Sequence, residues 1–251
     1  MSMSMSKSAP AQRPRRLLAL VLGTIVLAVL VALGTWQVQR MYWKEALIAQ
    51  IAERTQSEAR PLAEMEVKYR ASGDVDYWPV TLSGTFLHQG ERHFFATWQG
   101  KSGFYVYTPL QLEDGRYVLV NRGFVPYDIK DPAKRAEGQV SGPVTIVGLA
   151  RNPLDAKPGA LLPDNDTAKN IFYWKDRAAM ASSAGLPEGA VVLPFFVDAD
   201  DAPNPGGLPI GGVTLIDMPN NHLQYVITWY GLAAALVGVM AFWLFRKPDH
   251  E

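Results

Sequence analysis

One histidine lies where its imidazole could bind a metal beside a long apolar segment. The chain has four histidines, and His222 follows Asn220 and Asn221 directly before that segment. In a helix, Tyr225 and Trp229 would lie on nearly the same face as His222, three and seven residues further on. An axial imidazole with aromatic neighbours suits a flat, apolar macrocycle such as haem. The same pattern also suits an interfacial belt, in which the aromatic side chains anchor the helix and His222 caps it.

The other histidines give weaker signals. His88 and His93 flank Gly90 on the arms of an expected tight hairpin, where they could converge on copper, but the sequence offers no third soft ligand. Exposed turn histidines are the simpler interpretation. His250 lies in the C-terminal tail and predicts nothing.

The sequence carries no recognised catalytic motif. Its lack of cysteine excludes disulfides, thiolate metal sites, a thiol nucleophile and covalent c-type haem attachment. Dinucleotide, phosphate-loop, nucleophile-elbow and zinc-protease motifs are all missing from the sequence. A solvent-facing strand position explains Ser83, and a solvated acidic turn explains Asp198, Asp200 and Asp201 better than a calcium site does. We therefore expect no enzymatic activity.

The charge balance argues against nucleic acid as a partner. Lysine and arginine together number 24, and aspartate and glutamate together also number 24, so the formal net charge is zero. A surface that attracts a polyanion without base specificity needs an excess of positive charge.

Two uncharged runs of 20 residues must position the candidate side chains, and they cover residues 17–36 and 226–245. At about 1.5 Å rise per residue, each run would cross the roughly 30 Å hydrocarbon core of a bilayer as a helix. We predict transmembrane helices at residues 17–36 and 225–245. The alternatives are buried core helices and, for the first run, a signal peptide with a faint cleavage site at Ala32-Leu33-Gly34.

Basic residues in the two short tails predict the orientation of these helices. Lys7, Arg13, Arg15 and Arg16 precede the first run without any acidic residue, and Arg246 with Lys247 follows the second. Since basic residues stay on the cytoplasmic side, tails 1–16 and 246–251 should lie inside and residues 37–224 outside. The outer compartment would be the bacterial periplasm or the mitochondrial intermembrane space. The N-terminal Met-Ser repeat does not resemble an Arg-rich transit peptide, which favours a bacterial inner membrane.

The outer domain is predicted to be rich in β-structure. The first helix should continue as an amphipathic stalk over residues 37–58, and Asp114-Gly115 predicts a tight hairpin. A short helix with an aspartate cap is expected at residues 176–184, and a Pro/Gly-rich loop at residues 198–212. The resulting class is an α+β membrane protein, with two transmembrane helices flanking an antiparallel sheet or small barrel with few helices. Its strands are expected at residues 80–86, 93–98, 104–112, 117–124, 144–150, 191–197 and 213–216.

Both predicted spans carry features that suit contacts within the membrane. Small residues recur four positions apart, a spacing that permits close packing against the other helix or a neighbouring membrane protein. Arg40 and Lys44 follow the first span, where they could meet the propionates of a haem or simply bound the apolar segment. The small pairs are Ala19/Gly23, Ala28/Ala32, Gly231/Ala235 and Ala234/Gly238.

Several motifs occur in the order of a known family. They are Gly34-Thr35-Trp36-Gln37 with Arg40 and Lys44, Arg122-Gly123-Phe124-Val125-Pro126, Pro-Phe-Phe-Val-Asp at 194–198, Pro205-Gly206-Gly207, and Pro219-Asn220-Asn221-His222-Leu223-Gln224-Tyr225. In these motifs, and over nearly all of the chain after its tail, the sequence resembles the Surfeit locus protein 1 family of cytochrome c oxidase assembly factors.

The resemblance implies a non-enzymatic inner-membrane factor that helps to build the haem-copper centre of cytochrome c oxidase subunit I. Bacterial members of the family are thought to bind haem a, and His222 matches the histidine implicated in that binding. On this basis we expect haem a, received from haem a synthase, to take His222 as its axial ligand. Trp36, Tyr225 and Trp229 would frame the ring, and Arg40 or Lys44 would meet its propionates.

Two other functions remain open from the sequence. The protein could be a membrane scaffold that stabilises nascent subunit I without carrying haem, or a tethered sensor or binding module for a small ligand. For a scaffold, the expected contact residues are Arg122, Gly123, Pro205, Gly206, Gly207, Asn220 and Asn221, together with the small-residue faces of the helices.

Overall fold

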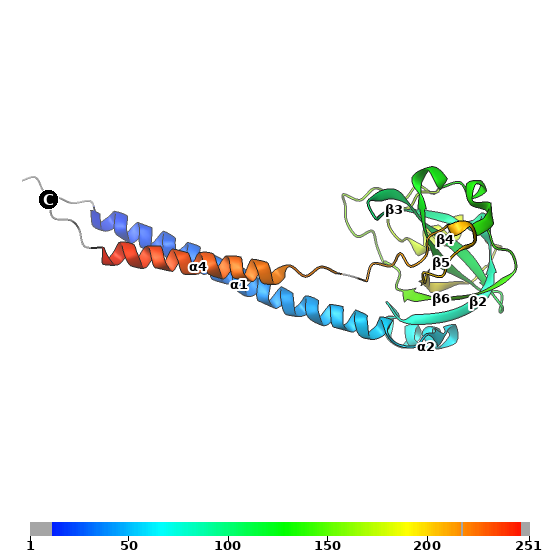
Figure 1. The fold of residues 1–251 in the computed structure, drawn as a ribbon, viewed down its shortest axis with the longest axis horizontal. Helices are drawn as coiled ribbons and strands as arrows, with labels where there is room; N and C mark the ends of the chain where they lie inside the picture. The colour runs from blue at the N-terminus through cyan, green and yellow to red at the C-terminus, as the bar shows by residue number, and fades with distance from the viewer. Residues whose placement is uncertain (1–11, 217, 247–251) are drawn as a thin grey trace, which may run out of the picture. The chain divides into compact units, whose positions relative to one another are not determined.

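The protein folds as two units, which are described separately. The computed structural model describes residues 12–216 and 218–246 (Figure 1). The helical unit comprises the chain up to Ala49 and the segment after the barrel, and the barrel unit comprises Gln50–Ile216. The first eleven residues of the predicted N-terminal tail, and residues 247–251 with His250, lie outside the described residues.

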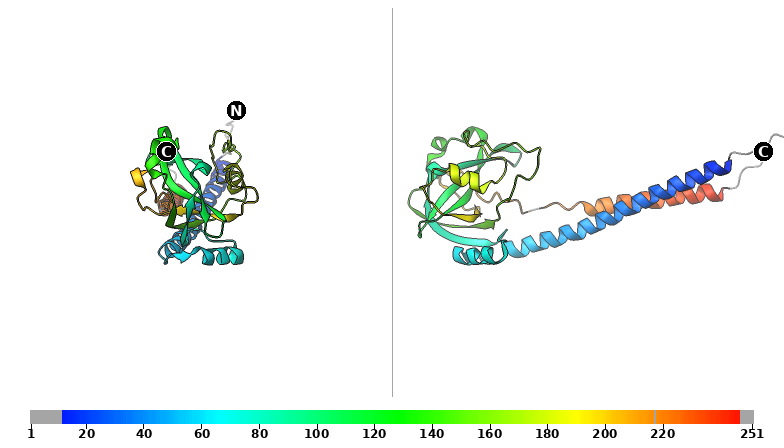
Figure 2. Two further views of the ribbon diagram at one scale, coloured as in Figure 1. Left: turned by 90° about the vertical axis from the view of Figure 1, so that its right-hand side faces the viewer. Right: turned by 180° about the vertical axis from the view of Figure 1, so that it is seen from behind.

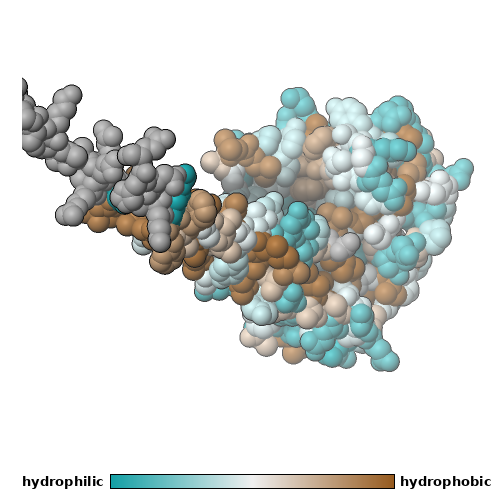
Figure 3. Space-filling view, turned by 60° about the vertical axis from the view of Figure 1, so that its left-hand side comes forward, coloured by the Kyte–Doolittle hydropathy of each residue, from teal (hydrophilic) through white to brown (hydrophobic). Residues whose placement is uncertain are grey.

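The helical unit consists of two helices, α1 (Gln12–Thr55) and α4 (His222–Phe245). Both are long and apolar enough to cross a membrane. They lie side by side in Figure 1 and in the right-hand view of Figure 2. Most of their apolar side chains point outward, and brown, hydrophobic atoms cover much of the visible face of the helices in Figure 3. Exposed apolar side chains are what a lipid-facing helix requires.

The two helices pack along a seam whose residues alternate at spacings of three and four. That heptad-like spacing keeps one stripe of each helix facing its partner, as in a coiled coil. Along this seam the side chains are buried or half-buried, whereas most of the neighbouring positions are exposed. On α1 the seam comprises Leu20, Gly23, Leu27, Leu30, Gly34, Gln37, Met41 and Lys44, and on α4 it comprises His222, Val226, Trp229, Ala233, Leu236 and Met240.

Glycine brings the backbones together at two seam positions. A Cβ on Gly23 would lie 2.7 Å from the Met240 sulfur, and one on Gly34 would lie 3.0 Å from the Tyr230 ring. The predicted small-residue pairs are otherwise not used between these helices. Gly231 and Gly238 face open space, and their small partners on α4 are exposed. Of the small residues predicted from the four-residue spacing, only Gly23 lies in the seam between α1 and α4, and packing of the others against a neighbouring membrane protein stays a prediction.

The barrel unit is a five-stranded barrel with two flanking strands. Its closed order is β2-β6-β7-β5-β4, and β4 returns to β2 through the pairs Gly84↔Leu112 to Phe86↔Leu110. This confirms the predicted α+β class with a small barrel. The strands are β1 (Arg60–Pro61), β2 (Pro79–Phe86), β3 (Arg92–Trp98), β4 (Lys101–Leu112), β5 (Tyr117–Pro126), β6 (Pro143–Arg151) and β7 (Val192–Ala199).

The barrel is antiparallel except at two pairings. Strand β7 runs parallel to β5, and the short β1 runs parallel to β2. The purely antiparallel expectation is wrong at these two places. The chain between the parallel strands β5 and β7 covers residues 127–191 and includes β6, and such a long connection allows a strand to return parallel to an earlier one. The predicted hairpin after β4 is confirmed, since the Leu112 N–H donates to the Arg116 carbonyl at 2.8 Å.

The barrel unit also contains short helices. Helix α3 (Arg177–Ser183) has the predicted aspartate cap, with Asp176 accepting from the Ala179 N–H at 2.9 Å. Helix α2 (Leu62–Ser72) was not predicted, because only Met65 is fully buried and its sequence carries little amphipathic pattern. Four 3₁₀ helices complete the unit: η1 (His88–Gly90), η2 (Tyr127–Ile129), η3 (Pro132–Gly138) and η4 (Pro205–Gly207).

The strand predicted at residues 213–216 does not form. Two other contacts hold this part of the chain: an isolated bridge joins Phe124 to Ile210, and the Thr214 hydroxyl donates to Asp198 Oδ2 at 2.9 Å. Val213 is nevertheless buried. The apolar pattern of residues 213–216 therefore indicates that the segment is partly buried, but it does not indicate that the segment pairs with another strand.

The last turns of α1 belong to the barrel unit. Arg54 donates to Asp74 Oδ2 at 2.7 Å and to the Asp76 carbonyl at 2.9 Å. Helix α1 runs through most of the residues predicted as a stalk and ends at Thr55, and the ion pair between Arg54 and Asp74 lies within the barrel unit.

Candidate functional site

His222 is the first residue of α4, and its side chain reaches across to α1. Its Nδ1 lies 2.7 Å from Gln37 Oε1, and its backbone N–H donates to Asn220 Oδ1 at 3.4 Å. An amide oxygen only accepts hydrogen bonds, so with the Gln37 amide in this orientation Nδ1 is the donor. In the neutral ring the lone pair then lies on Nε2, which has no hydrogen-bond partner among the described residues and is not buried.

This geometry differs from the interpretation in which His222 only caps its helix. The N-cap position belongs to Asn221, and no side-chain capping bond is made there. The imidazole instead pairs with a nearly buried glutamine, 8 % exposed, in the seam between the helices. His222 therefore presents one free ring nitrogen from a side chain whose other nitrogen is held.

The aromatic residues predicted around His222 divide into two groups. Trp229 lies in the seam, and its indole N–H is buried without a hydrogen-bond partner. Trp36 and Tyr225 are both about half exposed, on the two different helices. Tyr230, which the spacing argument did not assign to the site, packs on Gly34 and places its hydroxyl 3.1 Å from Thr35 Oγ1.

The two cations predicted near the site have different surroundings. Lys44 donates to the Pro219 carbonyl at 2.6 Å and so ties α1 to the chain just before α4. Arg40 is exposed, and its guanidinium lies 4.2 Å from the centre of the Trp43 ring. In this arrangement Arg40 is the more available partner for an anionic group.

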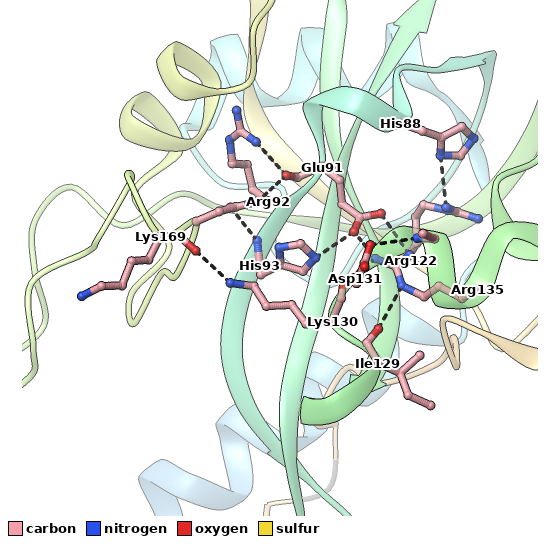
Figure 4. Close-up of polar contacts among 12 residues, drawn as sticks. His88, Glu91, Arg92, His93, Arg122, Ile129, Lys130, Asp131, Arg135 and Lys169 are labelled. Carbon is pink, nitrogen blue, oxygen red and sulfur yellow. Dashed lines mark hydrogen bonds and ion pairs between the residues drawn. The ribbon is translucent and has the colours of Figure 1, made fainter.

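Arg122, another predicted residue, lies inside the barrel unit among buried polar side chains (Figure 4). Arg122 is 2 % exposed and donates to the Gly138 carbonyl at 2.5 Å and to Asn204 Oδ1 at 3.2 Å. Its guanidinium lies 4.6 Å from the centre of the Phe86 ring. Burial lowers the pKa of Arg122 to about 10, which still leaves it charged at neutral pH. Arg122 therefore fastens the Pro/Gly loop to the barrel.

Gly123 and the glycine-rich loop fit against each other. Gly123 has a φ of +123°, and a Cβ there would collide with the Ile210 carbonyl. The Phe124 N–H donates to that same carbonyl at 2.8 Å. Among the predicted contact residues, Arg122 and Gly123 are buried and organise the loop, whereas Pro205, Gly206 and Gly207 remain exposed on it. Asn220 and Asn221 belong to the helical unit.

The sequence did not identify the ion cluster beside Arg122, which is also drawn in Figure 4. Glu91 is 3 % exposed, accepts from His93 Nε2 at 2.8 Å and forms an ion pair with Arg135. Burial raises the pKa of Glu91, but the bonds from His93 and Arg135 outweigh it, so the net pKa lies below its ordinary value. Arg135 is 44 residues away in the sequence, and no spacing pattern connects the two.

The copper hypothesis for His88 and His93 finds no support in this geometry. His88 Nε2 lies 2.7 Å from the Val140 carbonyl, while His93 is occupied by Glu91. Burial lowers the pKa of His88. Within residues 12–216 and 218–246, no group of three or more His, Cys, Asp or Glu side chains could hold a metal ion. The expectation that these are simple exposed turn histidines is also wrong, since His93 is buried and His88 is half-buried.

The acidic turn expected at residues 198–201 is only partly solvated. Asp198 is 3 % exposed, accepts from Asn121 Nδ2 at 3.1 Å and lies 3.6 Å from an Arg151 nitrogen. Asp198 therefore forms a buried ion pair with Arg151 near the end of β7, whereas Asp201 is exposed. Ser83 lies on an exposed strand position, as predicted, and shares a hydrogen bond with Thr145.

These features define a class of protein: a candidate two-span membrane protein with a small β-barrel domain, in which His222 has one ring nitrogen without a hydrogen-bond partner among the described residues. Comparison with known proteins identifies the family. The model of the SURF1 family matches residues 24–234. Surfeit locus protein 1 of Rattus norvegicus is 40% identical over 222 residues, which cover 81% of this chain and 68% of the relative. Its namesake in Homo sapiens is 37% identical, with 81% and 70% covered.

A more distant relative, the SURF1-like protein of Drosophila melanogaster, is 31% identical over 222 residues that cover 81% of this chain and 70% of the relative. The chain therefore belongs to the SURF1 family of cytochrome c oxidase assembly factors. The resemblance inferred from the sequence motifs is confirmed.

Proposed function

We propose that this protein binds haem a through His222 and assists its insertion into cytochrome c oxidase subunit I. The observation that carries the proposal is the His222 imidazole, whose Nδ1 is held by Gln37 while Nε2 is free. A histidine that ligates a metal through one ring nitrogen commonly donates a hydrogen bond from the other. When bound, haem a supplies an iron that accepts an axial nitrogen ligand.

The surroundings of His222 fit such a group. Trp36 and Tyr225 offer exposed aromatic surface, and the Trp229 indole N–H lacks a partner. Arg40 supplies an exposed cation for a propionate, and Lys44 would have to leave the Pro219 carbonyl to do so. One imidazole open to its surroundings suits a carrier, which must bind its cargo less tightly than the destination does.

The proposal places the protein in a bacterial inner membrane, with both tails in the cytoplasm and the barrel unit in the periplasm. The basic residues flanking the two candidate spans support this orientation. Haem a synthase would supply the cofactor and subunit I would receive it. The protein itself would catalyse no reaction, which agrees with the absence of known catalytic motifs from the sequence.

The test is the visible absorption spectrum of full-length protein purified in detergent from cells that make haem a. We expect wild-type protein to carry haem a, and His222→Ala to carry none while remaining inserted and folded. His250→Ala, which removes an imidazole from the tail, should retain the wild-type spectrum. Wild-type protein from cells without haem a synthesis should be colourless. Equal haem occupancy in His222→Ala would overturn the proposal.

A scaffold for nascent subunit I is the second candidate function. It is favoured by the exposed Pro205–Gly207 turn and by Gly231 and Gly238, which face open space on α4. Oxidase assembly in a strain that carries only His222→Ala distinguishes the two. Undiminished assembly with no bound haem would favour the scaffold, and loss of both would favour the carrier.

A further inference from the structure

We propose that Gln37 is a positioning residue that holds the His222 imidazole in the tautomer and orientation open to iron. This inference rests on the proposed function. Gln37 lies 185 residues from His222 in the sequence, yet its Oε1 is 2.7 Å from Nδ1. Both side chains lie in the seam between α1 and α4, where Gln37 is 8 % exposed.

Several contacts of the helical unit fix this pair. Gly34 lies three residues before Gln37 on the same face of α1 and admits the Tyr230 ring. Lys44 holds the Pro219 carbonyl, three residues before His222, and Asn220 accepts from the His222 backbone. The imidazole is therefore restrained through its backbone and through one ring nitrogen, and only Nε2 is left without a partner among the described residues.

A neutral amide suits transient binding better than a carboxylate does. An acceptor bonded to the ring nitrogen that does not bind the metal fixes the histidine tautomer and raises the basicity of the ligating nitrogen, and its loss typically lowers metal affinity about 10–100-fold. An amide oxygen carries no net charge, so it orients the ring while drawing its proton less strongly than a carboxylate would. The ligand is thus prepared for iron but kept from binding it too tightly.

A polar pair in an apolar seam has a simpler alternative role, which is to set the register of the two helices. That role predicts a change in stability when the pair is broken. It does not predict a change in the ring tautomer that follows the chemistry of the acceptor, nor a change in the bond between iron and His222. The experiment therefore measures tautomer and bond directly.

The first measurement uses the haem-free, full-length protein in detergent with ring-¹⁵N-labelled histidine. In wild type, the His222 resonances should show Nδ1 protonated and Nε2 bare. Gln37→Leu should shift His222 toward the tautomer protonated on Nε2. Gln39→Leu removes an exposed glutamine from the same helix and should leave the wild-type tautomer. An unchanged tautomer in Gln37→Leu would overturn the inference.

The second measurement uses haem a and the resonance Raman iron–histidine stretch of the ferrous complex. Gln37→Leu should lower both the stretching frequency and the haem affinity, the latter about 10–100-fold. Gln37→Glu should retain binding and raise the frequency, because a carboxylate is the stronger acceptor. Circular dichroism should show both variants folded.

The outcomes separate the two proposals. A wild-type protein that takes up no haem a overturns the proposed function, and with it the role of Gln37 toward iron. A wild type that takes up haem a, with Gln37→Leu and Gln37→Glu matching it in affinity and frequency, overturns the positioning role alone.

Discussion

At the scale of single residues, Glu91 is the acidic partner of a buried cationic group in the barrel unit. It pairs with Arg135 and His93, and all three side chains are at least 95 % buried. Removing one partner of a buried ion pair leaves the other charge uncompensated in a medium that solvates it poorly. The cluster thereby couples the start of β3 to η3, since Glu91 and Arg135 are 44 residues apart in the sequence.

We predict that Glu91→Gln destabilises the barrel unit by about 3–5 kcal/mol, the usual cost of breaking a buried pair. Urea unfolding followed by tryptophan fluorescence would measure the loss. Since the folded-state pKa of Glu91 lies below its ordinary value of 4.5, its contribution is complete above that pH and is lost as the pH falls below it. The wild-type protein should therefore lose stability on acidification more steeply than the variant.

Glu113→Gln is the matched control for this prediction. Glu113 is exposed in the turn between β4 and β5 and forms no ion pair among the described residues. Its replacement should change the free energy of unfolding by less than about 0.5 kcal/mol. If Glu91→Gln were equally mild, the cluster would not contribute to the stability of the fold.

At the scale of elements, the seam between α1 and α4 determines where His222 lies. Its contacts run antiparallel, from Gly23 with Met240 to Lys44 with Pro219. A simple coiled coil has uniform apolar contacts, whereas in this seam the helices approach closely at two glycines and Gln37 forms a polar pair with His222. The seam thus brings the candidate ligand and its acceptor together.

A cysteine pair can test this packing, because the natural chain contains no cysteine. Gly23→Cys combined with Met240→Cys should form an intrachain disulfide on mild oxidation, since a Cβ at position 23 would lie 2.7 Å from the Met240 sulfur. Protection from a maleimide-linked polymer would report it. Gly23→Cys combined with Gly231→Cys should stay reactive, because Gly231 faces open space. Equal labelling of both pairs would contradict the seam.

At the scale of the whole molecule, two spans would place both ends of the chain on the same side of the membrane. The positive flanks predict that this side is the cytoplasm. Leu161→Cys, at a fully exposed position of the barrel unit, should react with a membrane-impermeant maleimide in intact cells once the reagent reaches the periplasm. Ser6→Cys, in the N-terminal tail, should react only after the inner membrane is permeabilised. The reverse labelling would show the opposite orientation.

Features that depend on neighbouring residues were predictable from the sequence. Uninterrupted apolar runs, alternation in the strands, Asp114-Gly115 and the Asp176 cap each act over a few residues, and the structure contains the elements they predict. Helix α2 was missed because its apolar pattern is weak. The strand predicted at residues 213–216 was wrong because burial alone does not specify a partner strand.

The sequence by itself determined the family, the two candidate spans, the β-rich domain and the choice of His222 as the candidate metal ligand. Only the tertiary structure decided that Gln37 holds this histidine, that Arg122 fastens the loop, and that Glu91 and Arg135 share a buried site. Each of these contacts joins residues that are 44 to 185 positions apart. A hydrogen bond requires atoms within a few ångströms of each other, and such proximity leaves no periodic trace in a single sequence.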